Sequence, residues 1–345
     1  MVMVGGVPVG GNNRITVQTM ATVKTERVDE CAEELNACVD AGADIVRVAV
    51  RDEADASALK TLAEKVRAPI VADIHFDYRL ALRSAENGAA KIRINPGNIG
   101  GKREIKAVSD CLKQYGIPVR AGANSGSIEK EFLDKYGRSA EALAESALRS
   151  ARCFEEFGVE NIVLSAKASD AETTVKAYRI LRARCDYPLH LGVTEAGGGR
   201  YGIIKGAVGI GSLLMDGIGD TVRVSLTAPP IEEVRAAVEI LRAAGKRKDF
   251  AEVISCPTCG RCDYDVIGLS EKIRKATENT HKRIKIAVMG CVVNGVGEGR
   301  EADVGIAGGK DKCVIFRGGE AVRTVPAAEA ETELMKEVEL WLTKN

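Results

Sequence analysis

Four cysteines in the C-terminal third of the chain are spaced as metal ligands are. Three of them stand in the run Cys256-Pro-Thr-Cys259-Gly-Arg-Cys262, and Cys291 opens a later glycine-rich stretch. A two-residue spacing in a tight turn lets successive thiolates converge on one metal centre. The sequence therefore predicts a metal site that is held by thiolates.

The cysteine pattern favours an iron–sulfur cluster over a structural zinc site. A zinc ribbon would need a second Cys-x-x-Cys motif at Cys291, and a two-cluster ferredoxin would need a further Cys followed by Pro; the sequence has neither. Three or four thiolates from two loops fit one cluster better, although zinc stays an alternative on spacing alone. Glu298, in a predicted glycine-rich turn, is either a carboxylate ligand of an iron that lacks a thiolate or a solvated loop acid.

The remaining cysteines stand singly in predicted helices or at strand starts. Small buried thiols are common there, so we expect these residues to pack in the core. They are Cys31, Cys38, Cys111, Cys153, Cys185 and Cys313.

Single cations that interrupt or close predicted apolar strands form a second candidate site. They are Arg51, Arg93, Arg120, Lys167 and Arg223. In a β/α barrel the carboxyl ends of all strands meet at one face, so these side chains would surround one ligand. Guanidinium groups match phosphate oxygens bidentately, and a diphosphate can use several of them. The alternative is internal pairing with the acids Asp73, Glu195 and Asp220.

Polar residues that follow the same strands extend this predicted anion site. Asn95 belongs to the end of the fourth strand, and Asn124 and Ser127 follow the fifth. Amides and hydroxyls at these places either bond phosphate oxygens or close ordinary turns. His75 ends the third strand at the same face, whereas we expect the other two histidines to be structural.

Short β-branched runs alternate with amphipathic stretches through the first two thirds of the chain. The predicted strands are Ile15–Met20, Ile45–Val50, Pro69–His75, Lys91–Asn95, Pro118–Gly122, Asn161–Lys167, Leu189–Glu195 and Thr221–Leu226. The predicted helices include Arg27–Asp40, Asp55–Val66, Ala140–Phe157 and Ile231–Ala244. Repeats of strand and crossover helix over ~250 residues are typical of a (β/α)₈ barrel. We expect a TIM-type barrel over residues 1–245, with a doubly wound open sheet as the alternative.

A charged break near residue 245 separates this barrel from a predicted α+β domain over residues 250–345. Its expected elements are a strand ending at Ser255, a helix over Leu269–Glu278, strands over Ile284–Met289 and Asp303–Ala307, a hairpin of Cys313–Arg317 with Ala321–Val325, and a closing helix over Ala327–Leu342. The metal-binding cysteines and Glu298 fall on its loops.

Length and composition agree with two globular domains. The chain has 345 residues, of which 45% are hydrophobic and 28% charged. Its 49 Lys and Arg balance 49 Asp and Glu, so no global field draws it to nucleic acid or to an anionic membrane. No apolar window reaches the ~18 residues of a membrane span, and the N-terminus lacks the features of a signal peptide. We expect a cytoplasmic protein with free thiols.

Several long motifs resemble one enzyme family. They are the cysteine motif at Cys256, the segment Gly290-Cys291-Val-Val-Asn294-Gly-Val-Gly-Glu298, Thr194-Glu195-Ala-Gly197, and Gly217-Ile-Gly-Asp220-Thr-Val-Arg223-Val-Ser225. This set, which spans nearly the whole chain, resembles the bacterial 4-hydroxy-3-methylbut-2-enyl diphosphate synthases of the methylerythritol phosphate route to isoprenoids. The resemblance implies a [4Fe-4S] cluster held by Cys256, Cys259, Cys291 and Glu298, with Cys262 as a neighbour.

The same resemblance implies the reaction and the partners. The expected reaction is reductive ring opening and dehydration of 2-C-methyl-D-erythritol 2,4-cyclodiphosphate, with reduced ferredoxin or flavodoxin as electron donor. Arg51, Arg93, Arg120 and Lys167 would hold the diphosphate, and Glu195 would move a proton. A homodimer is expected in which the cluster domain of one chain caps the barrel of its partner, with closure inside one chain as the alternative.

Two other functions fit the residues taken alone. One is a non-redox barrel enzyme, such as a phospho-sugar lyase, with a structural zinc domain. The other is an electron carrier whose cluster uses four thiolates, Cys262 among them, and whose barrel cations are dispensable. Zinc without sulfide would identify the first, and indifference to a change at Glu298 would identify the second.

Overall fold

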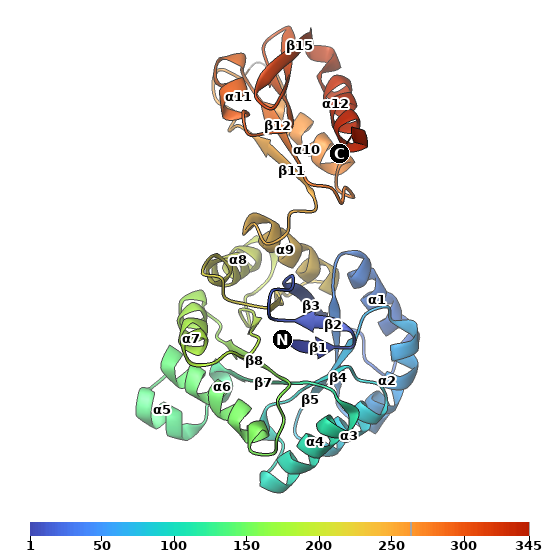
Figure 1. Ribbon diagram of the computed structural model, residues 1–345, viewed down its shortest axis with the longest axis vertical. Helices are drawn as coiled ribbons and strands as arrows, with labels where there is room; N and C mark the ends of the chain where they lie inside the picture. Colours follow the sequence, from blue (N-terminus) through green and yellow to red (C-terminus); the bar gives the residue numbers. More distant parts are fainter. Residues whose placement is uncertain (263, 345) are drawn as a thin grey trace. The chain divides into compact units, whose positions relative to one another are not determined.

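The computed structural model describes residues 1–262 and 264–344, except for the side chains of residues 293, 294 and 296. The chain forms two compact units, Met1–Lys246 and Arg247–Asn345. Figure 1 shows a closed ring of strands and helices in the first unit and a sheet with flanking helices in the second.

The first unit is a parallel (β/α)₈ barrel, as the sequence predicts. Its eight strands follow the order β8-β7-β6-β5-β4-β3-β10-β9, and a bridge between Leu164 and Leu189 joins β8 to β9 and closes the ring. The strands are β3 (Thr16–Met20), β4 (Ile45–Val50), β5 (Ile70–Ile74), β6 (Lys91–Arg93), β7 (Val119–Asn124), β8 (Ile162–Lys167), β9 (His190–Leu191) and β10 (Thr221–Val222). The alternative prediction of a doubly wound open sheet is therefore wrong.

The last two barrel strands are shorter than predicted. The strand expected over Leu189–Glu195 is reduced to β9: the amide of Thr194 donates to the carbonyl of Ala168 beyond β8, and Glu195, with a φ of +52°, leaves the extended region. The strand expected over Thr221–Leu226 is reduced to β10, because the amide of Leu226 bonds a carboxylate of Glu233 instead of a neighbouring strand. Both segments still carry candidate residues to the same face.

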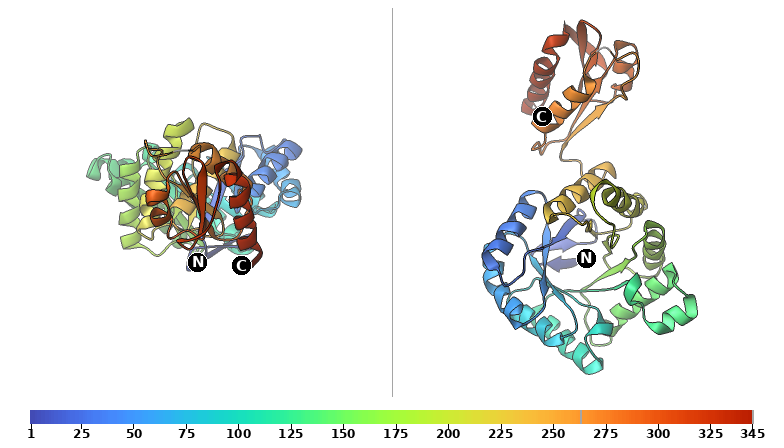
Figure 2. Two further views of the ribbon diagram at one scale, coloured as in Figure 1. Left: turned by 90° about the horizontal axis from the view of Figure 1, so that it is seen from above. Right: turned by 180° about the vertical axis from the view of Figure 1, so that it is seen from behind.

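Helices surround the strands, and Figure 2 shows the ring from behind. They are α1 (Val28–Asp40), α2 (Glu53–Lys65), α3 (Tyr78–Glu86), α4 (Lys102–Tyr115), α5 (Lys130–Tyr136), α6 (Ala140–Glu155), α7 (Ala171–Arg184), α8 (Gly199–Met215) and α9 (Pro230–Ala243). Side-chain caps start several of them; Asp52, for example, accepts from the amide of Asp55. Within the described residues, no helix has the length and apolar character that crossing a membrane requires.

A hairpin that the sequence analysis does not predict lies across the barrel centre in Figure 1. It consists of β1 (Val2–Val4) and β2 (Val7–Val9), paired antiparallel. Val4 and Val9 are buried against Ile45 and Val71. Because Ile45 begins β4, the hairpin covers the amino-terminal end of the barrel and leaves the opposite end, the mouth, for ligands.

The second unit is a five-stranded sheet with helices on both faces. β11 (Ala251–Ser255), β12 (Ile284–Met289) and β13 (Val304–Gly308) are parallel, and β14 (Lys312–Arg317) and β15 (Glu320–Pro326) continue antiparallel. α10 (Val266–Ala276) and α12 (Ala330–Lys344) share the larger core, in which Cys313 is buried as predicted. The α+β prediction is confirmed.

One segment of this unit differs from its prediction. The expected glycine-rich turn after Cys291 is a short helix, α11 (Val292–Glu298). A Cβ at Gly295 would lie 2.8 Å from the Cβ of Met289 and 2.9 Å from that of Ala307, so the glycine lets the helix lie close to the sheet. Tertiary packing thus overrides the low helix propensity of glycine.

Candidate functional site at the barrel mouth and the cysteine loops

The interior of the barrel is polar, although branched aliphatic side chains usually fill this fold. Alternate residues of a strand point to opposite faces. In β4, Val46, Val48 and Val50 are buried against the surrounding helices, which leaves Arg47 on the inner side. The same alternation turns further cations inward: Lys91, Arg93, Arg120, Lys167 and Arg223.

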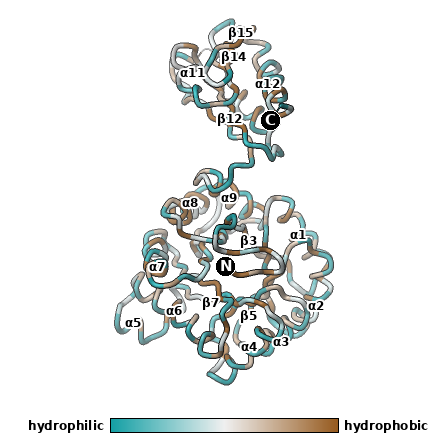
Figure 3. The backbone as a smooth tube through the Cα atoms, in the orientation of Figure 1, coloured by the Kyte–Doolittle hydropathy of each residue, from teal (hydrophilic) through white to brown (hydrophobic). Residues whose placement is uncertain are grey.

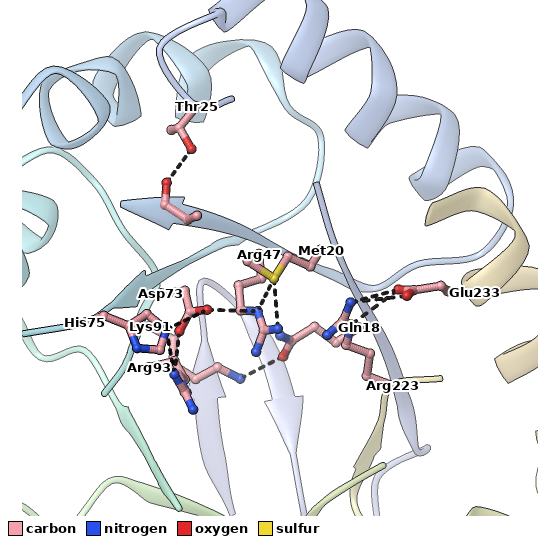
Figure 4. A network of polar contacts seen from close by, with 11 residues as sticks. Gln18, Met20, Thr25, Arg47, Asp73, His75, Lys91, Arg93, Arg223 and Glu233 are labelled. Atoms are coloured by element: carbon pink, nitrogen blue, oxygen red, sulfur yellow. Dashed lines mark hydrogen bonds and ion pairs between the residues drawn. The ribbon is translucent and has the colours of Figure 1, made fainter. Parts of the chain in front are cut away.

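Asp73 is a carboxylate that lies between two of these cations, Arg47 and Arg93 (Figure 4). It accepts a hydrogen bond from Arg93 at 3.0 Å, and its other oxygen lies 3.8 Å from Nε of Arg47. His75 Nε2 lies 3.7 Å from the same oxygen. Burial alone would raise the pKa of Asp73, but Arg47, His75 and Arg93 outweigh it and hold this pKa well below its ordinary value. Asp73 is therefore an ionised partner of two arginines.

Arg120 has no such partner. It lies directly opposite Arg93 in the β6–β7 register, where like charges destabilise a sheet. It is 3% exposed, and its Nε and Nη1 atoms have no hydrogen-bond acceptor among the described residues. Burial, reinforced by Arg47 and Arg93, lowers its pKa. A buried guanidinium with unsatisfied donors is a site that an anion would complete.

Lys167 is in a similar position at the end of β8. It is buried beside Asn124 of β7 in the strand register, and within the described ranges it makes no ion pair within 4.0 Å. Burial, followed by Arg120 and Arg223, lowers the pKa of Lys167. A bound anion would therefore stabilise its charged form.

Arg223 is paired, but not with an acid that the sequence analysis considers. Its Nη2 lies 3.2 Å from Oε2 of Glu233, which α9 supplies. Glu233 also accepts from Thr19 and from the amide of Leu226. The suggested partner Asp220 instead accepts from the amide of Leu189, so that pairing is wrong. No described contact joins Glu195 to any of these cations either.

We call Arg47, Arg93, Arg120, Lys167 and Arg223 the cation ring. Two carboxylates, Asp73 and Glu233, face these five cations. Internal pairing therefore leaves a formal excess of three positive charges at the mouth. This excess is what a multiply charged anion such as a diphosphate would neutralise.

The predicted site residue Arg51 has a different environment from the ring. It is half exposed, and Asp55 accepts from its Nε at 2.7 Å and from its Nη2 at 3.0 Å, with Glu26 3.5 Å away. Arg47, four residues earlier, is the arginine of this strand that the structure brings to Asp73. Arg51 was a candidate because it closes the predicted strand. The alternation of inward and outward residues along β4 would have identified Arg47 as well.

The polar residues that follow the strands differ in what they contact. Asn95 is buried and caps the 3₁₀ turn Pro96–Asn98 by accepting from the amide of Gly97. Ser127 is exposed and donates to the carbonyl of Asn124 at 3.3 Å. His75 is half exposed and lies 3.1 Å from Nη1 of Arg93. His75 and the cation ring therefore lie together, whereas Asn95 and Ser127 make the turn contacts of the alternative interpretation.

Backbone strain is concentrated at the mouth. Among the described non-glycine residues, positive φ occurs only at Phe76 (+65°) and Glu195 (+52°), each just after a barrel strand. Such conformations cost ~1–3 kcal/mol and cluster at functional sites. Phe76, which the sequence analysis does not single out, is 76% exposed and lines a recess of about 360 Å³ with Arg51, Asp73 and His75. Glu195, four residues after the end of β9, is also exposed.

In the second unit, two adjacent parallel strands carry the candidate ligands. Cys256 follows β11 and Cys291 follows β12 by two residues, and the two strands pair up to Ser255 and Val288. Carboxyl ends of neighbouring parallel strands lie at one edge, so both loops start side by side. Tyr264 donates to the carbonyl of Met289 at 2.9 Å and fastens the end of the cysteine loop to β12.

The sulfurs of Cys256 and Cys262 share the space beside Gly290. A Cβ on this glycine would lie 2.7 Å from Sγ of Cys262 and 3.3 Å from Sγ of Cys256. The amide of Gly290 donates to Cys256 at 3.1 Å, and the Cys262 thiol donates to the carbonyl of Tyr264 at 3.1 Å. Gly290 therefore makes a cradle for two sulfurs, which suits a soft metal centre.

Cys259 and Glu298 are exposed on the same unit. A hydrogen bond from the backbone amide of Arg261 lowers the pKa of the Cys259 thiol, which favours the thiolate that binds metals. Within the part of the chain that the structure describes, no three Cys, His, Asp or Glu side chains already converge as a ligand set. The donor chemistry fits a cluster, and the loops would adjust around it.

These features define a (β/α)₈-barrel protein with a cation-rich mouth and a separate cysteine-bearing α+β unit. Residues 1–238 match the GcpE TIM-barrel domain, and residues 252–340 match the GcpE protein C-terminal domain. The chain belongs to the GcpE family.

Known relatives agree along the whole length. A "4-hydroxy-3-methylbut-2-en-1-yl diphosphate synthase (flavodoxin)" from Caldanaerobacter subterraneus is 51% identical over 339 residues, covering 98% of this chain and 96% of that protein. A protein of the same name from Geobacter sulfurreducens is 50% identical over 345 residues, covering 100% and 98%. A type I 3-dehydroquinate dehydratase structure from Clostridium difficile, 12% identical with a TM-score of 0.53, covers 71% of this chain and 97% of its own and shares the barrel fold alone.

Proposed function

We propose that this chain is a 4-hydroxy-3-methylbut-2-en-1-yl diphosphate synthase. It opens the ring of 2-C-methyl-D-erythritol 2,4-cyclodiphosphate by two-electron reduction with loss of water, in isoprenoid precursor synthesis. The relatives that carry this name match both units at about half identity. The observation of the chain itself that best supports the proposal is the unpaired charge of the cation ring, which suits a diphosphate. Ten free thiols support a reducing, cytoplasmic location.

The proposed cofactor is a [4Fe-4S] cluster held by Cys256, Cys259, Cys291 and Glu298. When bound, such a cluster supplies electrons one at a time and a Lewis-acidic iron whose carboxylate ligand is exchangeable. The amide of Gly290, which donates to Cys256, and the exposure of Glu298 support this assignment, while the thiol of Cys262 is engaged with the carbonyl of Tyr264. Flavodoxin, which the names of the relatives print, or ferredoxin would be the donor.

The cation ring would hold and orient the diphosphate. Arg120 and Lys167 are buried and have no described counter-ion, so their bonds to phosphate oxygens would form away from competing water. Asp73 fixes Arg47 and Arg93, and Glu233 fixes Arg223, so these guanidinium groups need little reordering. Asn124, beside Lys167, is placed to donate to the same anion.

Glu195 is the proposed proton carrier at the mouth. Its left-handed backbone holds the side chain at a fixed place after β9, and the side chain is exposed to an incoming ligand. A carboxyl at this point would exchange a proton with the hydroxyl that leaves as water.

A homodimer is the proposed assembly. Exposed apolar side chains line one face of α8: Tyr201, Ile204, Val208 and Met215 are 71%, 49%, 54% and 74% exposed. Their spacing follows the helical repeat, and Figure 3 shows the apolar character of this helix. A self-complementary contact of two such faces is the simplest way to cover them.

The test of the proposed function combines metal and activity measurements on protein prepared without air. We expect iron with acid-labile sulfide, turnover of the cyclic diphosphate with reduced flavodoxin, and loss of that turnover in Glu298→Ala. Zinc without sulfide would support a structural zinc domain. A Glu298→Ala protein with an unaltered cluster spectrum and a purely electron-carrying activity would support the carrier.

A further inference from the structure

Phe76, two residues after the end of β5, has the most exposed large apolar side chain among the described residues. Its ring is 76% exposed. It belongs to none of the hydrophobic cores that the described residues form. An aromatic ring stabilises a fold chiefly through the apolar surface that it buries. The free barrel therefore gains little from this ring.

The backbone at Phe76 is also strained. The amide of Asp77 donates to the carbonyl of His75 at 2.8 Å, and the φ of Phe76 between them is +65°. A three-residue turn with positive φ at its centre is the rare and strained form of the γ-turn. Glycine adopts positive φ without the steric cost of a Cβ, and Asn tolerates it better than Phe does. Phenylalanine is thus an unfavourable residue for this turn.

Contacts on both sides hold the turn in place. Before it, Nε2 of His75 lies 3.7 Å from Asp73 and 3.1 Å from Nη1 of Arg93 (Figure 4). After it, Asp77 caps α3 by accepting from the amide of Arg79. Strained conformations persist where the surroundings fix them in this way, and they cluster at ligand sites. The position of the ring therefore points to a ligand.

The recess that Phe76 lines has a polar side and a hydrocarbon side. Polar groups come from Arg51, Asp73 and His75, and hydrocarbon comes from Ala49, Val50 and Phe76. The centre of the Phe76 ring lies 6.0 Å from that of the His75 ring. Asp73 also faces Arg47 and Arg93, so the recess adjoins the cation ring. A ligand that suits both sides has an anionic group and a carbon skeleton.

We propose that Phe76 is a specificity-determining residue whose ring packs against the carbon skeleton of the cyclic diphosphate while the cation ring holds the phosphates. The skeleton of this substrate carries a methyl group and ring carbons, which inorganic diphosphate lacks. The contact is apolar, and no bond of the substrate changes in it. This inference rests on the proposed function, because it takes the cyclic diphosphate as the ligand.

Equilibrium binding of the cyclic diphosphate to the oxidised holoenzyme tests the contact. Phe76→Asn removes the ring and leaves a residue that tolerates positive φ. We expect its affinity to fall about tenfold, which corresponds to roughly 55 Å² of hydrocarbon surface left in water. The midpoint of urea unfolding should stay at or above that of the wild type, because the strain is reduced. Phe76→Tyr, which keeps the ring, should bind within about twofold of the wild type.

Two controls separate this contact from other effects. The affinity for inorganic diphosphate, measured by competition, should be equal in the wild type and in Phe76→Asn, because this anion has no carbon for the ring to contact. Tyr115→Asn removes another exposed ring, 44% exposed at the end of α4, and should leave the affinity for the cyclic diphosphate unchanged.

Equal affinities of the wild type and Phe76→Asn for the cyclic diphosphate would overturn the inference while the proposed function stands. An equal loss for inorganic diphosphate would overturn it too, since the ring would then act through His75 and the anion site. A lowered unfolding midpoint together with weaker binding would assign the ring to the fold instead of the ligand. A wild-type holoenzyme that binds neither compound would reject the proposed function, and the inference with it.

Discussion

Arg47 in β4 and Arg51 directly after it show how position along a strand decides the role of an arginine. Arg47 is buried beside Asp73, whereas the half-exposed Arg51 is held by Asp55 and Glu26. We expect Arg47→Met to lower kcat/KM about 10- to 100-fold, since a charged hydrogen bond contributes ~1.5–3 kcal/mol. Arg51→Met should cost less than about threefold by the same reasoning. Steady-state kinetics would check both, and an equal loss in the two variants would contradict this assignment.

Glu233 stabilises the barrel from inside through Arg223, Thr19 and the amide of Leu226. Removing one partner of a buried pair leaves the other charge unmatched. Glu233→Gln should therefore lower the free energy of unfolding by about 2–4 kcal/mol. The exposed pair of Glu232 with Arg235 provides the control, because Glu232→Gln should cost under ~1 kcal/mol. Similar midpoints of urea unfolding for the two variants would show that the buried Glu233 pair stabilises the barrel no more than the exposed Glu232 pair does.

Single residues were predictable from sequence where their chemistry is local. The spacing of Cys256 and Cys259 indicates a thiolate site, and the isolated charges Arg93 and Arg120 indicate an anion. Lys91 and Glu233 were not predictable in the same way, because their importance comes from what lies opposite them in a closed barrel. Lys91 of β6 contacts Gln18 of β3, and Glu233 of α9 pairs with Arg223, which follows β10. No pattern among residues close in the sequence indicates these contacts.

Among the elements, the strand ends of β11 and β12 determine where the cysteines meet. Gly290 lies close to two of these sulfurs, and Gly290→Ala would drive a methyl group into the sulfurs of Cys256 and Cys262. We expect iron and sulfide content to fall by more than half, with the barrel still folded, because crowding a packed site is destabilising. Gly260→Ala, in the cysteine loop after β11 with open space around it, should retain both. Metal analysis and circular dichroism together would check this, and full iron content in Gly290→Ala would refute the cradle.

Some helices and strands could be predicted from local sequence patterns, and others could not. Long periodic strands and helices of the barrel were predictable, since alternation and helical repeat are local. The hairpin of β1 and β2 was not, because each strand has three residues and is fixed by burial against Ile45 and Val71. The helix α11 was not either, since its glycines argue for a turn until Met289 and Ala307 are seen against Gly295.

At the level of the whole molecule, the proposed reaction needs the cation ring and the cluster in one working site. Mixed dimers of Cys256→Ser and Arg120→Ala chains would show which barrel and which cluster cooperate. Closure across chains predicts recovered activity, because one of the two sites regains both intact parts. No recovery despite demonstrated mixed dimers would indicate closure within one chain. Val208→Glu, which charges the apolar face of α8, should abolish both dimer and recovery, while Ile267→Glu on α10 should not.

The most direct measurement is phosphorus-31 resonance of the cyclic diphosphate incubated without air with the reconstituted enzyme and reduced flavodoxin. The two signals of the ring should be replaced by those of a linear diphosphate monoester, and Arg120→Met should slow this conversion at least tenfold. An enzyme that contains its iron and sulfide, receives electrons and yet leaves the ring signals unchanged would contradict the proposed function.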